Sequence, residues 1–372
     1  MNKNYDYISN KLKERVDKKL LPGFSLMISE SGNVVYKNHS NYKGNEIFRL
    51  ASMTKPVTAV AALKAEELCF INIEDEITKY LDGFNNMEIG KIENDNLVLS
   101  SVSSKNITIK SILRHESGIG SGAVGDYQLA RRTRPKTLKE AIDDYKNWYL
   151  DFEPESQAFY SGLVALDIFA YIIEVTSKMS YYDFLKKYIL YPLNMVDTTY
   201  KLNDEQKLRL VQMYTMPNKE PRVIEKYHIN SYTGSESLLE GYTGGASGLM
   251  STLDDYSHFA MMLAGKGMYN GIRVLKEESV IKMSTDIIDL PHPGVDNIFN
   301  WGYGVYVRGD NCDYQPLKKG TFGWSGAYSP HFFVNTEDNT SVVFMTNLAN
   351  DGGSDSPNIK VLEKAFNEIN KR

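Results

Sequence analysis

The sequence predicts an α/β protein in which one β-sheet is built from both ends of the chain and a helical region is inserted between them. Runs of β-branched and aromatic residues lie near both termini, whereas segments with helical periodicity occupy the middle. The chain has 372 residues, more than one average domain. This distribution predicts a discontinuous α/β domain over residues 1–79 and 196–372 and an all-helical domain over residues 80–195.

The composition is typical of a soluble protein with a large core. Hydrophobic residues make up 42% and charged residues 24% of the chain. The 42 Lys and Arg residues against 47 Asp and Glu residues give a net charge of −5, and no basic patch stands out. Neither a nucleic acid nor an anionic membrane is therefore expected as a partner.

Neither a disulfide framework nor a secretion signal is visible in the sequence. The two cysteines, Cys69 and Cys312, are too few for a disulfide framework or a multi-cysteine zinc site. The N-terminus has no apolar segment, and the most apolar stretch, Ala165 to Val175, is interrupted by Asp167 and Glu174. We expect a cytoplasmic protein with reduced thiols that does not span a membrane.

The N-terminal part of the chain predicts helices and short strands in alternation. An amphipathic helix is expected from about Tyr5 to Leu20. The predicted strands lie at residues 24–29, 34–36 and 47–50. From Ser52 to about Leu68, small apolar residues lie on nearly all sides, which predicts a helix packed inside the protein.

Helical periodicity dominates the middle of the chain, and strands dominate its last third. The best helical segments cover residues 107–113, 138–149 and 163–176. The β-rich segments cover residues 302–307, 332–334 and 341–346. A last helix is predicted because four apolar residues fall on one stripe: Ile359, Leu362, Phe366 and Ile369.

Several common catalytic motifs are absent from the sequence. It contains no His-Glu-x-x-His motif and no Cys/His cluster, so a metal site is not expected. It contains neither a Gly-x-Ser-x-Gly nucleophile elbow nor a Walker A sequence. One Gly-x-Gly-x-x-Gly occurs at Gly120–Gly125, but it follows a helical segment rather than the strand that a dinucleotide site requires. It is predicted to be a flexible loop.

The pair Ser52 and Lys55 is the most informative feature of the sequence. Ser-x-x-Lys also occurs at Ser40 and at Ser279, both in surface-like contexts, so the spacing alone is weak. Ser52 differs because it follows a short strand and opens the small-residue helix, with Pro56 in the first helical turn. Residues three apart share a helix face, so Lys55 Nζ can approach Ser52 Oγ and act as its base.

Further motifs follow this pair in order along nearly the whole chain. They are Ile107-Thr-Ile-Lys-Ser-Ile-Leu-Arg-His115-Glu-Ser-Gly118, Phe159-Tyr160-Ser-Gly162, Gly244-Gly-Ala-Ser-Gly-Leu-Met-Ser-Thr252 and Phe322-Gly-Trp324-Ser325-Gly326-Ala327. Together with Ser52-Met-Thr-Lys55, they resemble the serine β-lactamase and penicillin-binding-protein superfamily, specifically the class C-like branch that includes the family VIII carboxylesterases. This resemblance implies a β-lactamase/DD-peptidase-like α/β fold, with an antiparallel sheet flanked by helices, an all-helical region and an active site between them.

The resemblance also implies a role for each matching residue. Ser52 matches the nucleophile, Lys55 matches its base partner, and Tyr160 matches the tyrosine that carries the proton between nucleophile and leaving group. The oxyanion hole would consist of the backbone N–H groups of Ser52 and Ala327. No cofactor is implied. A serine hydroxyl does need a neighbour to take its proton, and tyrosine acts as a base near neutral pH only beside a cation.

Two departures from the family pattern bear on the substrate. The usual Tyr-x-Asn is Tyr160-Ser161-Gly162 here, so the amide side chain is missing. The usual Lys-Thr-Gly is Trp324-Ser325-Gly326, and an indole cannot supply a positive charge to a substrate carboxylate. A Trp-x-Gly third motif resembles that of the family VIII esterases and implies a substrate-binding segment for an uncharged acyl group.

His115 and the loop after Gly125 are two further candidates for a functional role. His115 could suggest a Ser-His-Asp triad, but in the family that it resembles this histidine belongs to a structural turn. The side chains in the loop after Gly125 could line a pocket rim or simply be solvated: Tyr127, Arg131, Arg132 and Arg134.

The sequence thus favours a cofactor-free serine hydrolase that acts through an acyl-enzyme on small esters or amides. A β-lactamase or D-alanyl-D-alanine carboxypeptidase is one alternative. A non-catalytic relative that binds peptidoglycan or a protein partner is another, although such a protein needs no activated serine. The natural substrate, the oligomeric state and the choice of working base between Lys55 and Tyr160 remain open at this point.

Overall fold

The structure is a computed structural model that describes residues 3–133, 135–216, 222–223, 242–288, 290, 299–309 and 317–371. Cys312 and Arg134, both singled out in the sequence, lie outside the described residues. None of the helices in the described ranges combines the length and hydrophobicity that crossing a bilayer requires. Within the same ranges, no group of three or more His, Cys, Asp or Glu side chains could hold a metal ion.

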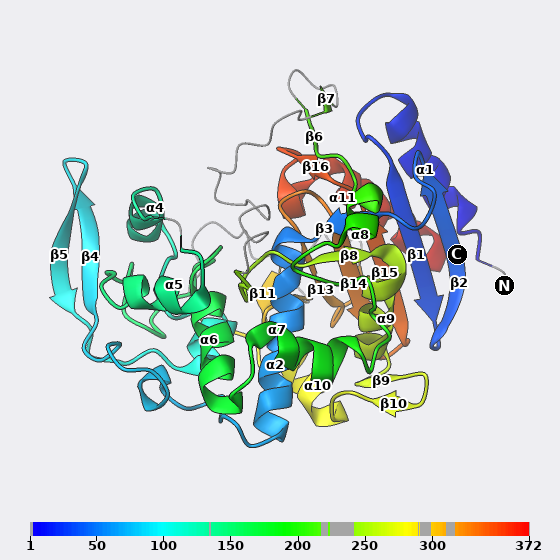
Figure 1. The fold of residues 1–372 in the computed structure, drawn as a ribbon. Helices are drawn as coiled ribbons and strands as arrows, with labels where there is room; N and C mark the ends of the chain where they lie inside the picture. The colour runs from blue at the N-terminus through cyan, green and yellow to red at the C-terminus, as the bar shows by residue number, and fades with distance from the viewer. Residues whose placement is uncertain are drawn as a thin grey trace.

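A seven-stranded sheet forms the centre of the α/β part, and every neighbouring pair in it is antiparallel. Its strands are, in spatial order, β11 (Phe299–Trp301), β12 (Tyr306–Arg308), β13 (Phe322–Ser325), β14 (His331–Asn335), β15 (Thr340–Met345), β1 (Phe24–Glu30) and β2 (Asn33–Ser40). The N-terminal strand β1 pairs directly with the C-terminal strand β15, so both ends of the chain build one sheet (Figure 1). The prediction of such a sheet is confirmed.

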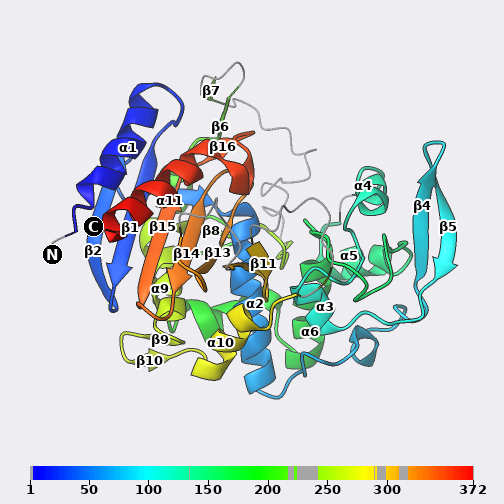
Figure 2. The same cartoon turned by 180° about the vertical axis from the view of Figure 1, so that it is seen from behind.

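Helices cover both faces of this sheet. On one face α1 (Asp6–Asp17) and α11 (Pro357–Asn370) pack against each other and against the sheet (Figure 2). On the other face lies α9 (Leu253–Ala264). Beyond β11 at the edge of the sheet, the N–H of Tyr303 donates to the carbonyl of Met283 in α10 (Glu277–Thr285) at 3.0 Å. Neighbouring residues of β14 point to opposite faces: Phe333 contacts Phe366 of α11, whereas Phe332 contacts Phe259 of α9.

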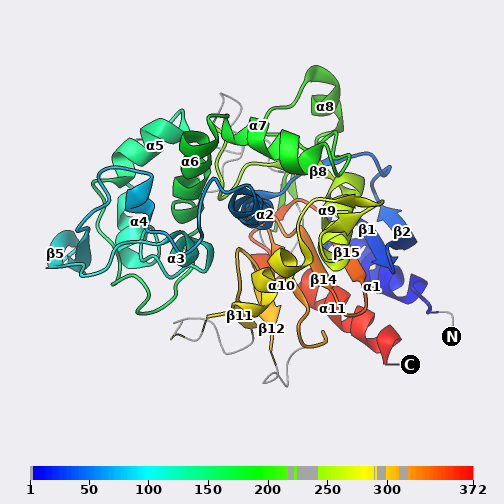
Figure 3. The ribbon, with the colours of Figure 1, turned by 90° about the horizontal axis from the view of Figure 1, so that it is seen from below.

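Helix α2 (Thr54–Glu67) lies between the sheet and the helical region, as Figure 3 shows along its axis. A short 3₁₀ turn, η1 (Ala51–Met53), leads into it. Eleven of its fourteen residues are buried, so the prediction of an internal helix is confirmed. The small side chains of this helix allow close packing on several sides, and Lys55 is completely buried within it.

The helical region contains short helices joined by long loops. They are η2 (Ile77–Lys79), α3 (Ile109–Leu113), α4 (Ala123–Leu129), α5 (Leu138–Tyr145), α6 (Ala165–Ser177), α7 (Tyr181–Leu185) and the π-helix η3 (Lys186–Leu190). The prediction of an all-helical region over residues 80–195 is wrong in one respect. The strands β4 (Glu88–Glu93) and β5 (Asn96–Val102) form an antiparallel hairpin that projects from it (Figure 1).

Smaller elements complete the fold. The strand β3 (Ile47–Arg49) pairs with β8 (Met250–Thr252), and β9 (Met268–Tyr269) pairs with β10 (Ile272–Arg273). The strand β6 (Tyr214–Thr215) lies between β16 (Leu348–Ala349) and β7 (Arg222–Val223). The remaining helices are α8 (Asp204–Arg209) and η6 (Gly353–Asp355).

The predicted strand over residues 302–307 is correct only at residues 306 and 307, which belong to β12, because a turn occupies residues 302–305. Residues 302–305 separate β11 from β12, and the N–H of Gly302 donates to the carbonyl of Val305 at 2.9 Å. Gly304 has a φ of +62°, which favours glycine. A Cβ atom there would lie 2.9 Å from the Cβ of Ala59, so this glycine also lets the turn approach α2 closely.

Candidate active site

Ser52 lies in the middle of η1, where the chain passes from β3 into α2. The residues on either side of it are buried, whereas Ser52 is half-buried. The preceding residue, Ala51, has a φ of +47°, a left-handed conformation that is unfavourable for alanine. The surrounding structure must hold this backbone in place, and the serine hydroxyl is thereby presented in a defined position before the first turn of α2.

The Lys55 ammonium group lies one turn further along, and three acceptors surround it. Nζ lies 3.2 Å from Ser52 Oγ, 2.7 Å from the carbonyl oxygen of Gly162 and 2.9 Å from that of Ala246. A fully buried lysine is rare, and each of its hydrogen-bonding positions has a partner here. The predicted approach of Lys55 to Ser52 is therefore present in the structure.

Tyr160 reaches the same hydroxyl group from the loop before α6. Its hydroxyl donates to Ser52 Oγ at 2.8 Å, and Lys55 Nζ lies 4.9 Å from the centre of its ring. Ser52 Oγ is thus shared by a phenol and an amine. The structure brings together the three side chains that the sequence had singled out, although Tyr160 is 108 residues away from Ser52.

The third motif forms the end of β13 beside this group. The Trp324 ring lies 5.6 Å from that of Tyr160 and is mostly buried. A Cβ atom on Gly326 would lie 2.3 Å from the carbonyl oxygen of Leu50, so only glycine lets this segment approach the residues before Ser52. Ala327 packs against the cluster that contains Ala51. Among the described residues, neither the N–H of Ser52 nor that of Ala327 donates to a backbone carbonyl outside the helices and strands.

His115 packs against Tyr160 and Trp324. The centre of its ring lies 4.8 Å from that of Tyr160 and 6.1 Å from that of Trp324. Burial, assisted by the positive charge of Lys55, lowers the pKa of His115 to about 3. Its Nδ1 accepts the backbone N–H of Ser161 at 3.2 Å, and its φ is +59°. A neutral imidazole that is engaged in this way supports the backbone of the second motif and is a poor candidate for a general base.

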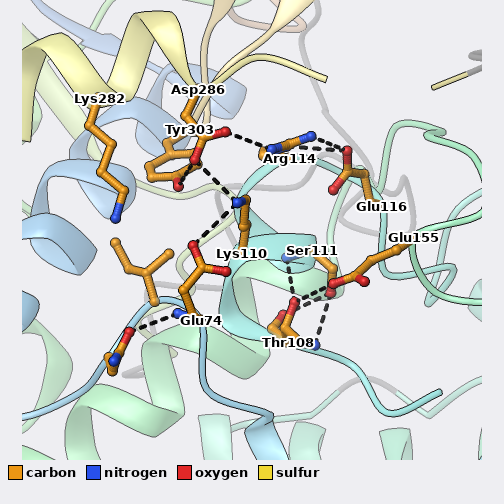
Figure 4. Close-up of polar contacts among 12 residues, drawn as sticks. Glu74, Thr108, Lys110, Ser111, Arg114, Glu116, Glu155, Lys282, Asp286 and Tyr303 are labelled. Atoms are coloured by element: carbon orange, nitrogen blue, oxygen red, sulfur yellow. Dashed lines mark hydrogen bonds and ion pairs between the residues drawn. The ribbon is translucent and has the colours of Figure 1, made fainter. Parts of the chain in front are cut away.

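An ionic network fixes the turn on which His115 lies (Figure 4). Arg114 donates to Asp286 at 2.8 Å and to Glu116 at 2.7 Å, and Tyr303 donates to Asp286 at 2.5 Å. Burial raises the pKa of Glu116 although Arg114 opposes this effect. The network therefore ties both neighbours of His115 to the end of α10. Sequence reasoning did not identify it, because its partners are far apart in the chain.

Asp167 is a buried residue near Lys55 whose role sequence reasoning also missed. Its carboxylate accepts the backbone N–H of Ala246 at 2.9 Å and the hydroxyl of Tyr242. The hydroxyl of Tyr200 donates to the carbonyl of Gly244 at 2.6 Å. These contacts hold the loop whose Ala246 carbonyl faces Lys55. A signal was present in the sequence: Asp167 interrupts the most apolar stretch of the chain.

The residues considered for a pocket rim differ from one another. Arg131 is exposed and stacks on Tyr127, with its guanidinium carbon 3.4 Å from the ring centre. Arg132 points inward instead and donates to the Tyr145 hydroxyl at 2.5 Å. Arg134 lies outside the described residues. The first two arginines are thus held by aromatic side chains of the helical region.

The Gly-x-Gly-x-x-Gly segment is only partly a loop, because α4 begins at Ala123. The backbone N–H groups of Ser121, Val124 and Gly125 all donate to the carboxylate of Asp151, at 2.8–3.2 Å. An internal carboxylate therefore occupies the position where a nucleotide phosphate would bind to a helix N-terminus. This contact explains the segment without a nucleotide.

The antiparallel sheet with helices on both faces, together with the central helix that carries Ser52 and Lys55, defines a β-lactamase/transpeptidase-like fold. A sequence profile of the Beta-lactamase family matches residues 8–365, and the chain therefore belongs to this family. This membership places it in the serine β-lactamase and penicillin-binding-protein superfamily. The resemblance seen in the sequence is confirmed.

The chain is similar to one curated protein and to two solved structures in particular. Protein Rv1367c of Mycobacterium tuberculosis (strain ATCC 25618 / H37Rv) is 25% identical over 352 residues, which cover 87% of this chain and 85% of that protein. The structure of EstCE1, a hydrolase with promiscuous acyltransferase activity, matches with a TM-score of 0.80 at 20% identity over 98% of both chains. A family VIII carboxylesterase matches with a TM-score of 0.75 at 14% identity over 97% of this chain and 96% of that chain. At such identities these structures show a common fold.

Proposed function

We propose that this protein is a serine hydrolase that forms an acyl-enzyme on Ser52 and acts on small uncharged esters or amides. The observation that carries the proposal is the position of Ser52 Oγ, within hydrogen-bonding distance of both Lys55 Nζ and Tyr160 Oη. An unactivated serine is a poor nucleophile, and this pair of neighbours supplies a route for its proton. Two proteins with the same fold are described as a hydrolase, EstCE1, and as a family VIII carboxylesterase, which is consistent with the proposal.

The contacts of Lys55 suit the removal of that proton. A neutral amine has two N–H groups and one lone pair. In a Lys55 that has lost a proton, the carbonyls of Gly162 and Ala246 would accept the two N–H groups, and the lone pair would face the hydroxyl of Ser52. Tyr160 contacts the same oxygen and can return a proton to the leaving alkoxide or amine. Lys55 and Tyr160 would therefore act as one proton-transfer unit.

The reaction would proceed in two steps. Ser52 Oγ attacks the acyl carbon, its proton passes through Lys55 and Tyr160 to the leaving group, and an ester forms on Ser52. Water then attacks this ester, releasing the acid and restoring the hydroxyl. In both steps the charge on the acyl oxygen would be stabilised by the N–H groups of Ser52 and Ala327, as such donors typically contribute about 3 kcal/mol each.

The third motif supports an uncharged acyl group. Trp324 and Tyr160 present aromatic rings beside Ser52, with Trp301 6.3 Å from Tyr160. A substrate carboxylate at Trp324 would lose water without gaining an ion pair, which is unfavourable, whereas an alkyl or aryl group would gain from burial. This arrangement argues against the alternative of a β-lactamase or D-alanyl-D-alanine carboxypeptidase, whose substrates carry a carboxylate at this position.

Steady-state hydrolysis of p-nitrophenyl butyrate tests the proposal. We expect turnover by the unmodified protein and a loss of several orders of magnitude in Ser52→Ala, because the nucleophile is removed. Ser40→Ala, which changes the serine of another Ser-x-x-Lys sequence, is the matched control and should retain full activity. Near-normal turnover in Ser52→Ala would contradict the proposal. Absence of any turnover in the unmodified protein would favour the non-catalytic alternative.

A further inference from the structure

The carboxylate of Asp286, at the end of α10, binds side chains from two separate segments of the chain (Figure 4). Its Oδ1 accepts a hydrogen bond from Arg114 Nη1 at 2.8 Å, and its Oδ2 accepts one from the Tyr303 hydroxyl at 2.5 Å. Lys110 Nζ lies 3.4 Å from the same Oδ2 and 3.2 Å from Oε1 of Glu74. Burial raises the pKa of Asp286, but these contacts outweigh burial and leave the pKa below its ordinary value. The carboxylate is therefore ionised at neutral pH and can accept all three groups.

The contact with Arg114 leads to the segment that carries Tyr160. His115, which directly follows Arg114, accepts the backbone N–H of Phe159 through its carbonyl at 2.9 Å. The Nδ1 of the same histidine accepts the backbone N–H of Ser161 at 3.2 Å. The residues on both sides of Tyr160 are thus bound to one residue. The position of Tyr160 therefore depends on the turn that begins at Arg114.

The contact with Tyr303 leads to Lys55. Tyr303 is fully buried and lies in the turn over residues 302–305, next to Gly304. The N–H of Gly304 donates to the carbonyl of Leu113 at 2.9 Å. A Cβ atom on Gly304 would lie 3.0 Å from the carbonyl oxygen of Lys55, so the turn packs directly against the backbone of the proposed base. The carboxylate that binds the Tyr303 hydroxyl therefore restrains this turn as well.

We propose that Asp286 is a positioning residue that holds Tyr160 and Lys55 at the separation that their proton transfer requires. The proposal rests on the proposed function, in which these two residues act as one unit on Ser52. Helical geometry relates Lys55 to Ser52, but it cannot place Tyr160, which is 108 residues away from Ser52. Asp286 connects the two parts of the structure that carry the unit. A misplacement of about 1 Å can lower the rate of a reaction roughly hundredfold.

Steady-state kinetics test the proposal with Asp286→Asn. This substitution keeps the size of the side chain but replaces one acceptor oxygen with an NH₂ group, which cannot accept. The kcat for p-nitrophenyl butyrate should fall roughly ten- to hundredfold with little change in KM, because proton transfer is misaligned while substrate contacts remain. Glu74→Gln is the matched control, since it changes the exposed carboxylate that also contacts Lys110, and it should retain full activity. Unchanged kcat in Asp286→Asn, or an equal loss in Glu74→Gln, would overturn the proposal.

The Tyr160→Phe background separates positioning from support of the fold. Because the proton-transfer unit is already lost in that background, Asp286→Asn should reduce kcat little further. A loss by the same factor in both backgrounds would overturn the proposal, because it would show that Asp286 only supports the fold. Should Asp286→Asn not fold, Tyr303→Phe removes one of the hydrogen bonds to Asp286 and should give the same pattern with smaller losses. Unchanged kcat in Tyr303→Phe would then overturn the proposal.

A measurement without turnover keeps this proposal separate from the esterase test. In protein labelled with ¹³C at Cζ of its tyrosines, the Tyr160 signal is the one lost in Tyr160→Phe. Asp286→Asn should shift this signal, because the hydrogen bond from Tyr160 to Ser52 changes, whereas Glu74→Gln should not shift it. An unshifted Tyr160 signal in Asp286→Asn would overturn the proposal, even in a protein that hydrolyses esters. A shifted signal in a protein without esterase activity would support the positioning of Tyr160 by Asp286 and contradict the proposed function alone.

Discussion

The carboxylate of Asp167 accepts a buried hydrogen bond of 2.9 Å from the backbone N–H of Ala246, a residue that contacts Lys55. The carbonyl group of the same Ala246 accepts a hydrogen bond from Lys55 Nζ, also at 2.9 Å. One residue of backbone therefore connects a buried carboxylate to the proposed base. The conformation of this loop is further restricted at Gly245, where a Cβ atom would lie 2.1 Å from the carbonyl oxygen of Leu166.

This connection predicts a difference between two substitutions at Asp167. Asp167→Ala leaves the N–H of Ala246 and the hydroxyl of Tyr242 without their acceptor, which should lower the free energy of unfolding by about 2–4 kcal/mol and reduce kcat. Asp167→Asn keeps an oxygen for Ala246 and should have a smaller effect on both quantities. Urea unfolding and steady-state kinetics measure them. Unchanged kcat in Asp167→Ala would show that this loop does not position Lys55.

Substitution of Lys55, of Tyr160 or of both should reduce the activity of the enzyme to a similar extent. If they form one proton-transfer unit, Lys55→Ala, Tyr160→Phe and the double variant should all reduce kcat/KM by similar factors. The measurement is a double-mutant cycle on p-nitrophenyl butyrate. Strictly additive losses would mean that the two residues act independently.

Because His115 is buried and neutral, it should make the folded protein less stable at acidic pH. The pKa of this residue is about 3 in the folded protein and about 6.5 when unfolded, so below pH 6.5 the unfolded state binds the proton first. The contribution of His115 to stability is thus complete above pH 6.5 and declines as the pH falls toward 3. Between pH 6.5 and 5 the loss should be about 2 kcal/mol.

His115→Asn is the variant that tests this prediction, because asparagine tolerates a positive φ and can accept the N–H of Ser161. Urea unfolding of both proteins at pH 7 and at pH 5 gives the comparison. The stability difference between the two proteins should shrink by about 2 kcal/mol at the lower pH. A constant difference would indicate that His115 keeps an ordinary pKa in the folded protein.

The indole of Trp324 predicts which of two substrates has the higher kcat/KM. We expect kcat/KM for p-nitrophenyl butyrate to exceed that for a penicillin, whose carboxylate has no cation to meet at Trp324. Arg131→Gln is the control, since Arg131 stacks on Tyr127 and should have no influence on this order. If the penicillin were the better substrate and Arg131→Gln reversed the order, that arginine would supply the missing charge.

The sequence predicted those parts of the site that depend on local spacing. Ser52 and Lys55 are three residues apart at the start of a helix, so helical geometry alone brings them together. Tyr160 and the third motif were identified only through the resemblance to a known family, because no local rule relates residues separated by more than a hundred positions.

The errors in the predicted fold also have physical causes. The aromatic and β-branched residues over 302–307 are typical of a strand, but Gly304 adopts a positive φ and forms a turn against α2. The hairpin of β4 and β5 is largely exposed, so it lacks the buried face that produces a clear alternation of apolar and polar residues. Neither feature follows from hydrophobic patterning.

Intact-mass spectrometry after treatment with a fluorophosphonate tests the central claim most directly. The unmodified protein and Ser40→Ala should each gain the mass of one phosphonyl group, and Ser52→Ala should gain none. Peptide mapping should place the added group on Ser52. Labelling of Ser52→Ala to the same extent as the unmodified protein, or labelling at another serine, would contradict the assignment of Ser52 as the nucleophile.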